Sequence, residues 1–298
     1  MNADLFEAVV ELPDNAARRR YDSLIGVDEI KRRLVREAQI LLDPDTLRRW
    51  SERFHGGQIA ACEALADRPP MFLFAGDVGT GKTALAETFG DVVAREWKQS
   101  VYLFRLSLSS RGSGAVGEMT QLLAAAFEEV RASARSGSGV IMLIDEADAL
   151  AQSRETAQMH HEDRAGVNAL IRGLNSLTEH RLPVIVVLAT NRLSAIDPAV
   201  RRRAAAVFEF ERPTEEQRRR ALTALTAGLD LKSSDIDQLV AISGPTETRP
   251  WGYTFSDLYQ RLVPTAVLEA FPDAPLTAER LLAVAYELVP TPPFQEAL

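Results

Sequence analysis

The sequence predicts a three-layer α/β domain built on a parallel sheet, followed by a small all-helical domain. Segments of helical periodicity separate four short apolar runs, at residues 71–75, 101–108, 140–145 and 184–190. Continuous apolar strands that alternate with helices are typical of a parallel sheet covered on both faces. After Pro213 the strand signals stop, and Thr214 with Gln217 forms a capping-box pattern that opens a helical region.

This pattern also predicts the organisation of the chain. We expect a short N-terminal arm, a large α/β domain and a helical lid domain, at residues 1–20, 21–213 and 214–298. Apolar residues at helical spacing after Asp28 predict a first long helix. A second helical stretch covers residues 47–65, where Gly56 and Gly57 allow two shorter helices.

Composition and charge disfavour nucleic-acid and membrane partners. The 298 residues carry a formal net charge of −8, whereas non-specific binding to nucleic acid or anionic lipid draws on a basic surface. Cys62 is the only cysteine, which excludes an intramolecular disulfide and fits a reducing cytoplasm. Neither a secretion-signal pattern nor an apolar run of about eighteen residues occurs. We therefore expect a cytoplasmic protein with a protein partner.

The sharpest motif directly follows the apolar run at 71–75. It fits G-x-x-x-x-G-K-[ST] and consists of Gly76, Asp77, Val78, Gly79, Thr80, Gly81, Lys82 and Thr83, with Ala84 next along the chain. In such a loop backbone N–H groups surround phosphate oxygens, Lys82 reaches the β- and γ-phosphates, and the Thr83 hydroxyl ligates Mg²⁺. A structural glycine-rich turn is the alternative. The preceding strand favours an ATP site that residues 76–84 line.

Polar residues end two of the other apolar runs. Asp145 is expected to bind magnesium through water, and Glu146 to polarise the attacking water. A solvated turn is an equally good reading of an isolated acidic pair, but its position one βα interval after the glycine-rich loop favours catalysis. Asn191 would hydrogen-bond the γ-phosphate or the attacking water, although asparagine at a strand end usually serves a turn.

Together these motifs resemble the AAA+ family, from Tyr21 to about Leu268. The segment YDSLIGVDEIKRRL is similar to the one that lines the adenine pocket in that family, with Ile25 and Gly26 at its centre. GDVGTGKT resembles the Walker A motif, and IMLIDE the Walker B motif. The resemblance implies a P-loop NTPase fold with a helical lid, Mg²⁺ and ATP as ligands, and ATP hydrolysis.

The segment ATNRLSAIDPAVRRR is similar to the second region of homology of the family. That region supplies arginine fingers to the ATP of a neighbouring subunit, and by position Arg203 is assigned first and Arg202 second. Arg201 is then a surface or interface residue. A site completed by a neighbour implies an assembled ring, a hexamer by family precedent. A solvated basic cluster is the alternative interpretation.

Two regions depart from the usual family pattern. GYTFSDL, at 252–258, resembles the sensor-2 region, but Ser256 or Asp257 stands where many relatives have arginine. Arg249 or Arg261 could substitute, or the contact is absent, so sensor 2 stays unassigned.

The second departure lies at 113–127, where the family carries its central pore loop. Ala115 and Val116, followed by Gly117, occupy the positions of the expected gripping aromatic. Either small side chains grip the substrate, or the loop is a flexible linker without a grip.

Among AAA+ clades the chain resembles the pachytene-checkpoint remodellers of HORMA-domain proteins, including bacterial relatives from anti-phage cyclic-oligonucleotide (CBASS) systems. The likeness lies in LIDEADALAQSR, AGVNALIRGLNSL and IDPAVRRRAAAVFEFERP. It implies a HORMA-domain partner, with or without a bound cyclic-oligonucleotide nucleotidyltransferase, that ATP-driven pulling opens to end signalling.

Other functions remain as alternatives. A clamp loader or replication initiator would need a basic DNA-binding appendage, and none is evident in this acidic sequence. A degenerate nucleotide-binding scaffold is disfavoured because every hydrolytic residue is present. Unfolding for a separate protease stays open. His160 and His161, with Glu162 and Asp163, are interpreted as a solvated loop rather than a metal site.

Overall fold

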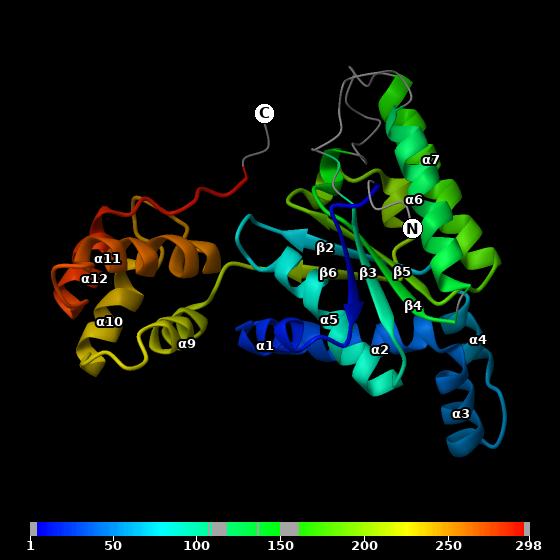
Figure 1. Ribbon diagram of the computed structural model, residues 1–298, viewed down its shortest axis with the longest axis horizontal. Coiled ribbons are helices and arrows are strands. Elements are labelled where there is room, and N and C mark those ends of the chain that lie inside the picture. The colour runs from blue at the N-terminus through cyan, green and yellow to red at the C-terminus, as the bar shows by residue number, and fades with distance from the viewer. Residues whose placement is uncertain (1–4, 107, 109–117, 136, 150–160, 295–298) are drawn as a thin grey trace. The chain divides into compact units, whose positions relative to one another are not determined.

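The chain forms two compact units in the computed structural model, which describes residues 5–106, 108, 118–135, 137–149 and 161–294 (Figure 1). The first, here called the sheet unit, comprises residues 1–23, 28–75 and 83–209. The second, the helical unit, comprises residues 24–27, 76–82 and 210–298. Two short segments, 24–27 and 76–82, therefore pack with the helical unit although the residues on both sides of them belong to the sheet unit.

A six-stranded mixed sheet forms the centre of the sheet unit. Its strands, in spatial order, are β1 (Ala8–Leu12), β3 (Val101–Leu106), β4 (Gly139–Ile144), β5 (Val184–Thr190), β2 (Met71–Gly76) and β6 (Ala206–Phe210). Strands β3, β4, β5 and β2 pair in parallel, as the four apolar runs predicted. Strand β1 pairs antiparallel with β3, so the sheet is mostly parallel with one antiparallel edge strand.

The two strands that the sequence did not reveal lie at the sheet edges. In β6 buried residues alternate with exposed or half-buried ones, and in β1 only Leu12 is buried, whereas β4 and β5 are buried along their whole length. An edge strand is covered incompletely, so it lacks the continuous apolar run that marks a central parallel strand. Part of the expected N-terminal arm therefore forms β1 of the sheet.

Parallel pairing brings the carboxyl ends of three central strands to one edge of the sheet. Val186 of β5 lies opposite both Met71 of β2 and Met142 of β4. Continuing this register pairs Ala75 with Thr190, and Ile144 with Leu188. The chain segments that follow these three strands therefore leave the sheet at the same edge.

Helices cover both faces of the sheet, which confirms the three-layer class (Figure 1). The helices of the sheet unit are α1 (Asn15–Ser23), α2 (Asp28–Leu42), α3 (Pro44–His55), α4 (Ala60–Ala66), α5 (Lys82–Trp97), α6 (Glu118–Ala134), α7 (His161–Glu179) and α8 (Pro198–Arg201). Helices α6 and α7 bury Phe127 and Leu174 in the core of one face. On the other face Phe89 of α5 packs against Phe74, and Arg33 of α2 lies over the Phe208 ring.

The helical unit is built from α9 (Glu215–Leu225), α10 (Ser233–Ile242), the π-helix η3 (Asp257–Leu262), α11 (Val263–Ala270) and α12 (Ala278–Glu287). Both hydrogen bonds of the predicted capping box, between Thr214 and Gln217, are present at the start of α9. Tyr253 is fully buried, and its hydroxyl lies 2.8 Å from the carbonyls of Ala285 and Leu288.

The helical stretch at 47–65 is divided as its glycine pair allowed. Helix α3 ends at His55, Gly56 adopts a left-handed conformation with φ of 73°, and α4 begins at Ala60. Glycine tolerates this conformation because it has no Cβ. Within the described residues, no helix combines the length and apolar character needed to cross a membrane.

Replacing Gly173 of α7 by alanine is expected to destabilise the sheet unit by about 1–3 kcal/mol. A Cβ at this position would lie 2.3 Å from the Phe127 ring of α6, so the two helices would have to separate. Gly57→Ala is the matched control, because nothing lies within 4 Å of its added methyl group. Thermal unfolding of both variants measures the difference, and equal melting temperatures would show that α6 and α7 are not tightly packed.

Candidate nucleotide-binding site

The Walker A loop, residues 76–82, encloses the ammonium group of Lys82. Gly79 and Gly81 have φ angles of 76° and 97°, a region that residues with a Cβ rarely adopt. The Lys82 side chain is buried, and its Nζ donates to the carbonyls of Gly76 at 2.9 Å and Asp77 at 2.8 Å. The loop is thus curled around a positive charge, as a phosphate-binding loop requires.

Two further hydrogen bonds, both to Asp77, stabilise the shape of the loop. The Thr80 hydroxyl donates to the Asp77 carbonyl at 2.8 Å, and the Val78 N–H donates to the Asp77 carboxylate at 3.0 Å. The Val78 side chain itself is exposed. Ala84 lies in the first turn of α5, where its carbonyl accepts from the Thr88 hydroxyl at 2.6 Å.

The two predicted magnesium-binding residues are in direct contact within the sheet unit. Thr83 lies in the first turn of α5, and Asp145 directly follows β4. The Thr83 hydroxyl donates to Asp145 Oδ2 at 2.9 Å. A hydroxyl and a carboxylate are the hard oxygen ligands that Mg²⁺ takes when phosphates and waters supply the rest. Among the described residues no group of three or more histidine, cysteine, aspartate or glutamate side chains could hold a metal ion. These residues fit Mg²⁺ bound together with a nucleotide.

Glu146 has an unusual backbone for a residue with a side chain. Its φ is 53°, and its N–H donates to Asp145 Oδ1 at 3.0 Å. A left-handed conformation at a non-glycine residue costs free energy and is found most often at functional sites. The side chain is exposed, so it is accessible to water.

Asn191 follows the last residue of β5, with a half-buried side chain. Its neighbour Thr190 is buried and donates from Oγ1 to Asp148 at 3.0 Å, while the Arg192 N–H donates back to that oxygen at 3.0 Å. This contact ties the end of β5 to the segment after β4. Asp148 was not among the predicted site residues, although it lies two residues after Glu146 in the same acidic segment.

The three arginines of the second region of homology lie at the end of α8. Asp197 caps this helix by accepting from the Ala199 N–H at 2.7 Å. Arg201 and Arg202 are exposed, whereas Arg203 is half-buried. The Arg203 guanidinium donates to the Ala199 carbonyl at 2.9 Å and to the Asn175 side chain at 3.3 Å.

Ile25 and Gly26, predicted to line the adenine pocket, pack within the helical unit. Ile25 lies against the apolar core of that unit. The Gly26 carbonyl accepts from the Gln217 side chain at 3.3 Å, and a Cβ at Gly26 would lie 2.7 Å from that side chain. Gln217 was identified from sequence only as a helix cap.

The sensor-2 candidates differ in where they lie. The Ser256 N–H donates to the Gly79 carbonyl of the Walker A loop at 3.1 Å. Asp257 is fully buried and accepts from Thr291 and Arg261. Arg249 donates to the carbonyls of Ile242 and Gly244. Both candidate arginines therefore make contacts within the helical unit.

Two sequence predictions fall outside the described residues. The predicted pore-loop residues Ala115, Val116 and Gly117 lie outside the described ranges. So does His160, the first residue of the predicted solvated loop. His161 begins α7.

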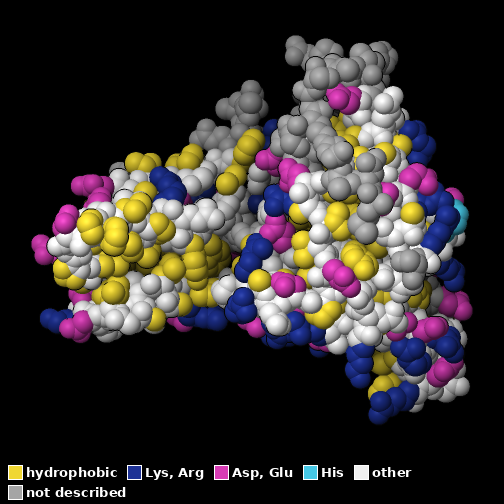
Figure 2. Space-filling model, in the orientation of Figure 1, with side chains coloured by type: hydrophobic (Ala, Val, Ile, Leu, Met, Phe, Trp, Pro, Cys, Tyr) yellow, Lys and Arg dark blue, Asp and Glu magenta, His cyan; other side chains and the backbone are white. Residues whose placement is uncertain are grey.

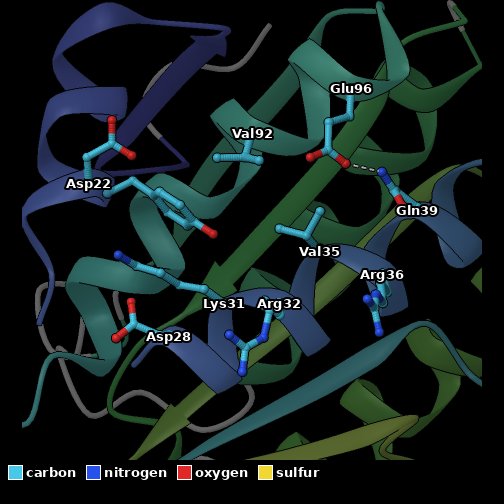
Figure 3. A pocket seen from close by; sticks show the side chains of 10 residues that line it. Asp22, Asp28, Lys31, Arg32, Val35, Arg36, Gln39, Val92 and Glu96 are labelled. Atoms are coloured by element: carbon cyan, nitrogen blue, oxygen red, sulfur yellow. Dashed lines mark hydrogen bonds between the residues drawn. The ribbon is translucent and has the colours of Figure 1, made fainter. Parts of the chain in front are cut away.

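The sheet unit also contains an open pocket of about 580 Å³ between α1, α2 and α5 (Figure 3). Lys31 is buried there, with its Nζ 4.5 Å from the centre of the Tyr21 ring. Burial raises the pKa of Tyr21 to about 12. At the other end Gln39 donates to Glu96. Three acidic and three basic side chains line the pocket, which gives it no single preferred ligand charge.

Comparison with known proteins agrees with this geometry. A family model described as ATPase family associated with various cellular activities (AAA) matches residues 72–212. CD-NTase-associated protein 6 of Escherichia coli (strain MS 115-1) is 46% identical over 299 residues, which cover 98% of this chain and 96% of that protein.

Solved structures give the same result. A chain in the structure of the E. coli MS115-1 HORMA:CdnC:Trip13 complex superposes with a TM-score of 0.92 at 46% identity, covering 99% of each chain. A Rhizobiales Trip13 superposes with a TM-score of 0.75 at 41% identity, covering 97% of this chain and 100% of that one. The chain therefore belongs to the AAA ATPase family. Its full-length relatives there include CD-NTase-associated protein 6 and Trip13.

Replacing Asp257 by asparagine is expected to lower the free energy of unfolding by about 1–3 kcal/mol at neutral pH. Burial alone raises the pKa of Asp257, but hydrogen bonds from Thr254, Thr291 and Arg261 outweigh it and hold the pKa below its ordinary value of 3.8. The ionised carboxylate therefore stabilises the fold above about pH 4, and this contribution is lost as the pH falls through the folded-state pKa.

Denaturant unfolding between pH 7 and pH 3 tests this expectation, with Asp273→Asn, at an exposed position, as the control. The gap between wild type and Asp257→Asn should narrow as the pH falls. A gap that is independent of pH would contradict the role of the ionised form.

Proposed function

We propose that this chain is an ATP-driven protein remodeller that opens or disassembles HORMA-domain protein complexes and thereby switches off anti-phage signalling of the CBASS type. The observation that carries the proposal is the full-length match to a chain from a HORMA:CdnC:Trip13 complex. By this match the partners are a HORMA-domain protein and a nucleotidyltransferase bound to it. We further propose that the protein acts in the cytoplasm and does not bind nucleic acid directly.

The ATP site is proposed to use the residues that the sequence singled out. Backbone N–H groups of residues 76–84 and the Lys82 ammonium hold the phosphates, and Thr83 and Asp145 hold Mg²⁺. When bound, Mg²⁺ neutralises negative charge on the phosphate oxygens. Ile25 and Gly26 contact the base. Their place in the helical unit, beside Gln217, supports a lid that responds to the nucleotide.

Hydrolysis to ADP and phosphate is proposed to depend on Glu146 and Asn191. Glu146 orients the attacking water and accepts its proton, which its exposed side chain permits. Asn191 hydrogen-bonds the γ-phosphate or that water. The contact between Thr190 and Asp148 supports this role, since it fixes the end of the strand that carries Asn191.

The chain is proposed to work as a homo-hexamer in which Arg203, and secondarily Arg202, enters the ATP site of a neighbour. Arginine stabilises negative charge on the transferred phosphoryl group. Exposed apolar side chains support assembly: Leu268, Phe271, Tyr286 and Val289 are each more than 70% exposed. Figure 2 shows hydrophobic side chains gathered over the helical unit.

The functional domains are proposed to follow the boundaries predicted from the sequence. Residues 21–213 form the ATPase domain, residues 214–298 the lid, and residues 1–20 an arm that supplies β1. Ala115, Val116 and Gly117 are proposed to form the pore loop that contacts substrate.

Replacing Glu146 by glutamine is expected to lower ATP turnover at least about 100-fold while ATP binding persists. With ATP bound, the variant should retain its substrate, so purification from the native host followed by mass spectrometry should recover a HORMA-domain protein. Lys82→Ala should recover none, and Glu179→Gln, an exposed acid on α7, serves as the control for turnover. Recovery of replication proteins with DNA would instead support the clamp-loader alternative.

Mixing two inactive variants tests the shared site. Arg203→Ala lacks the finger and Lys82→Ala lacks ATP binding, but random mixing in a closed ring places an intact ATP site beside an intact finger at roughly a quarter of the interfaces. Measurable ATPase activity is therefore expected in the mixture and not in either variant alone. Arg201→Ala should retain activity by itself. No recovery at any mixing ratio would refute the finger in trans.

A further inference from the structure

The Walker A loop carries an acidic residue, Asp77, in a segment that is proposed to hold a polyanion. Its carboxylate accepts from Arg212 Nε at 2.6 Å and from the Phe294 N–H at 3.1 Å. The Arg212 and Asp77 side chains are only 15% and 16% exposed, so solvent screens this ion pair weakly. All three residues belong to the helical unit.

Arg212 is itself held in place. It lies between β6 and α9, and its second guanidinium nitrogen donates to the Gly252 carbonyl at 2.8 Å. Gly252 begins the segment that reaches Ser256, whose N–H donates to the Gly79 carbonyl. The Walker A loop is thus anchored at Asp77 and at Gly79.

The same residue, Asp77, also determines where Lys82 lies. Its carbonyl accepts from Lys82 Nζ and from the Thr80 hydroxyl, both at 2.8 Å. Arg212 therefore holds the Asp77 side chain, while the Asp77 carbonyl holds the Lys82 ammonium group.

We propose that Arg212 is a positioning residue of the nucleotide site, which neutralises Asp77 and fixes the loop around Lys82. This inference rests on the proposed function, because it concerns the same ATP site. Without Arg212 the Asp77 carboxylate would repel the phosphates in a weakly screened environment. Arginine suits this task, since its guanidinium stays charged at every physiological pH and donates several hydrogen bonds in one plane.

If the unpaired Asp77 charge weakens nucleotide binding, removing that charge should reverse the effect of losing Arg212. Arg212→Gln is expected to raise the Kd for a fluorescent ADP derivative about tenfold in the full-length chain. Adding Asp77→Asn to it removes the unpaired carboxylate and should restore the Kd to within about threefold of wild type.

Arg68→Gln is the matched control, with a Kd equal to that of wild type. Arg68 likewise pairs with a part-buried acid, Glu37, at 2.6 Å and donates to the Ala205 carbonyl at 3.0 Å, but within the sheet unit. Should Arg212→Gln fail to fold by circular dichroism, Arg212→Lys keeps the charge. The Kd of Arg212→Lys for the ADP derivative should therefore lie closer to the wild-type value than to ten times that value.

The outcomes separate this inference from the function on which it rests. An unchanged Kd for Arg212→Gln, or a double variant as weak as Arg212→Gln alone, overturns the positioning role while the ATP site stands. A tenfold loss in Arg212→Lys also overturns it. Wild-type protein that binds no nucleotide overturns both, whereas rescue by Asp77→Asn supports the inference.

Discussion

Parallel pairing of the central strands is the constraint on which the rest of the sheet unit depends. Because β4, β5 and β2 run in one direction, the segments that follow them leave the sheet at the same edge. The contact between Thr83 and Asp145 and the contact between Thr190 and Asp148 both form there. Each joins residues far apart in the chain through hydrogen bonds that only this register permits.

A second constraint acts on the Walker A loop. Its residues 76–82 form part of the helical unit, held through Asp77 and Gly79, while the next residue, Thr83, belongs to the sheet unit. The glycines of the loop therefore pack within the helical unit, whereas Thr83 packs within the sheet unit.

Strands that are buried along most of their length were predictable from the sequence, whereas partly exposed strands were not. The four apolar runs identified β2, β3, β4 and β5 because a strand covered on both faces is apolar along most of its length. β1 and β6 were missed since edge strands carry exposed residues such as Glu11 and Glu209. The capping box at Thr214 was recognisable because all of its atoms come from four consecutive residues.

The sequence by itself determined the α/β class, the order of the motifs and the residue types at the candidate ATP site, because these depend on local patterns and fixed spacings. Tertiary structure alone decided which distant partners those residues meet. Arg212 lies 135 residues from Asp77 in the chain, and Asp257 lies 34 residues from Thr291. A charged residue gives no local sign of its partner, since the two are brought together only when the strands and helices between them have packed.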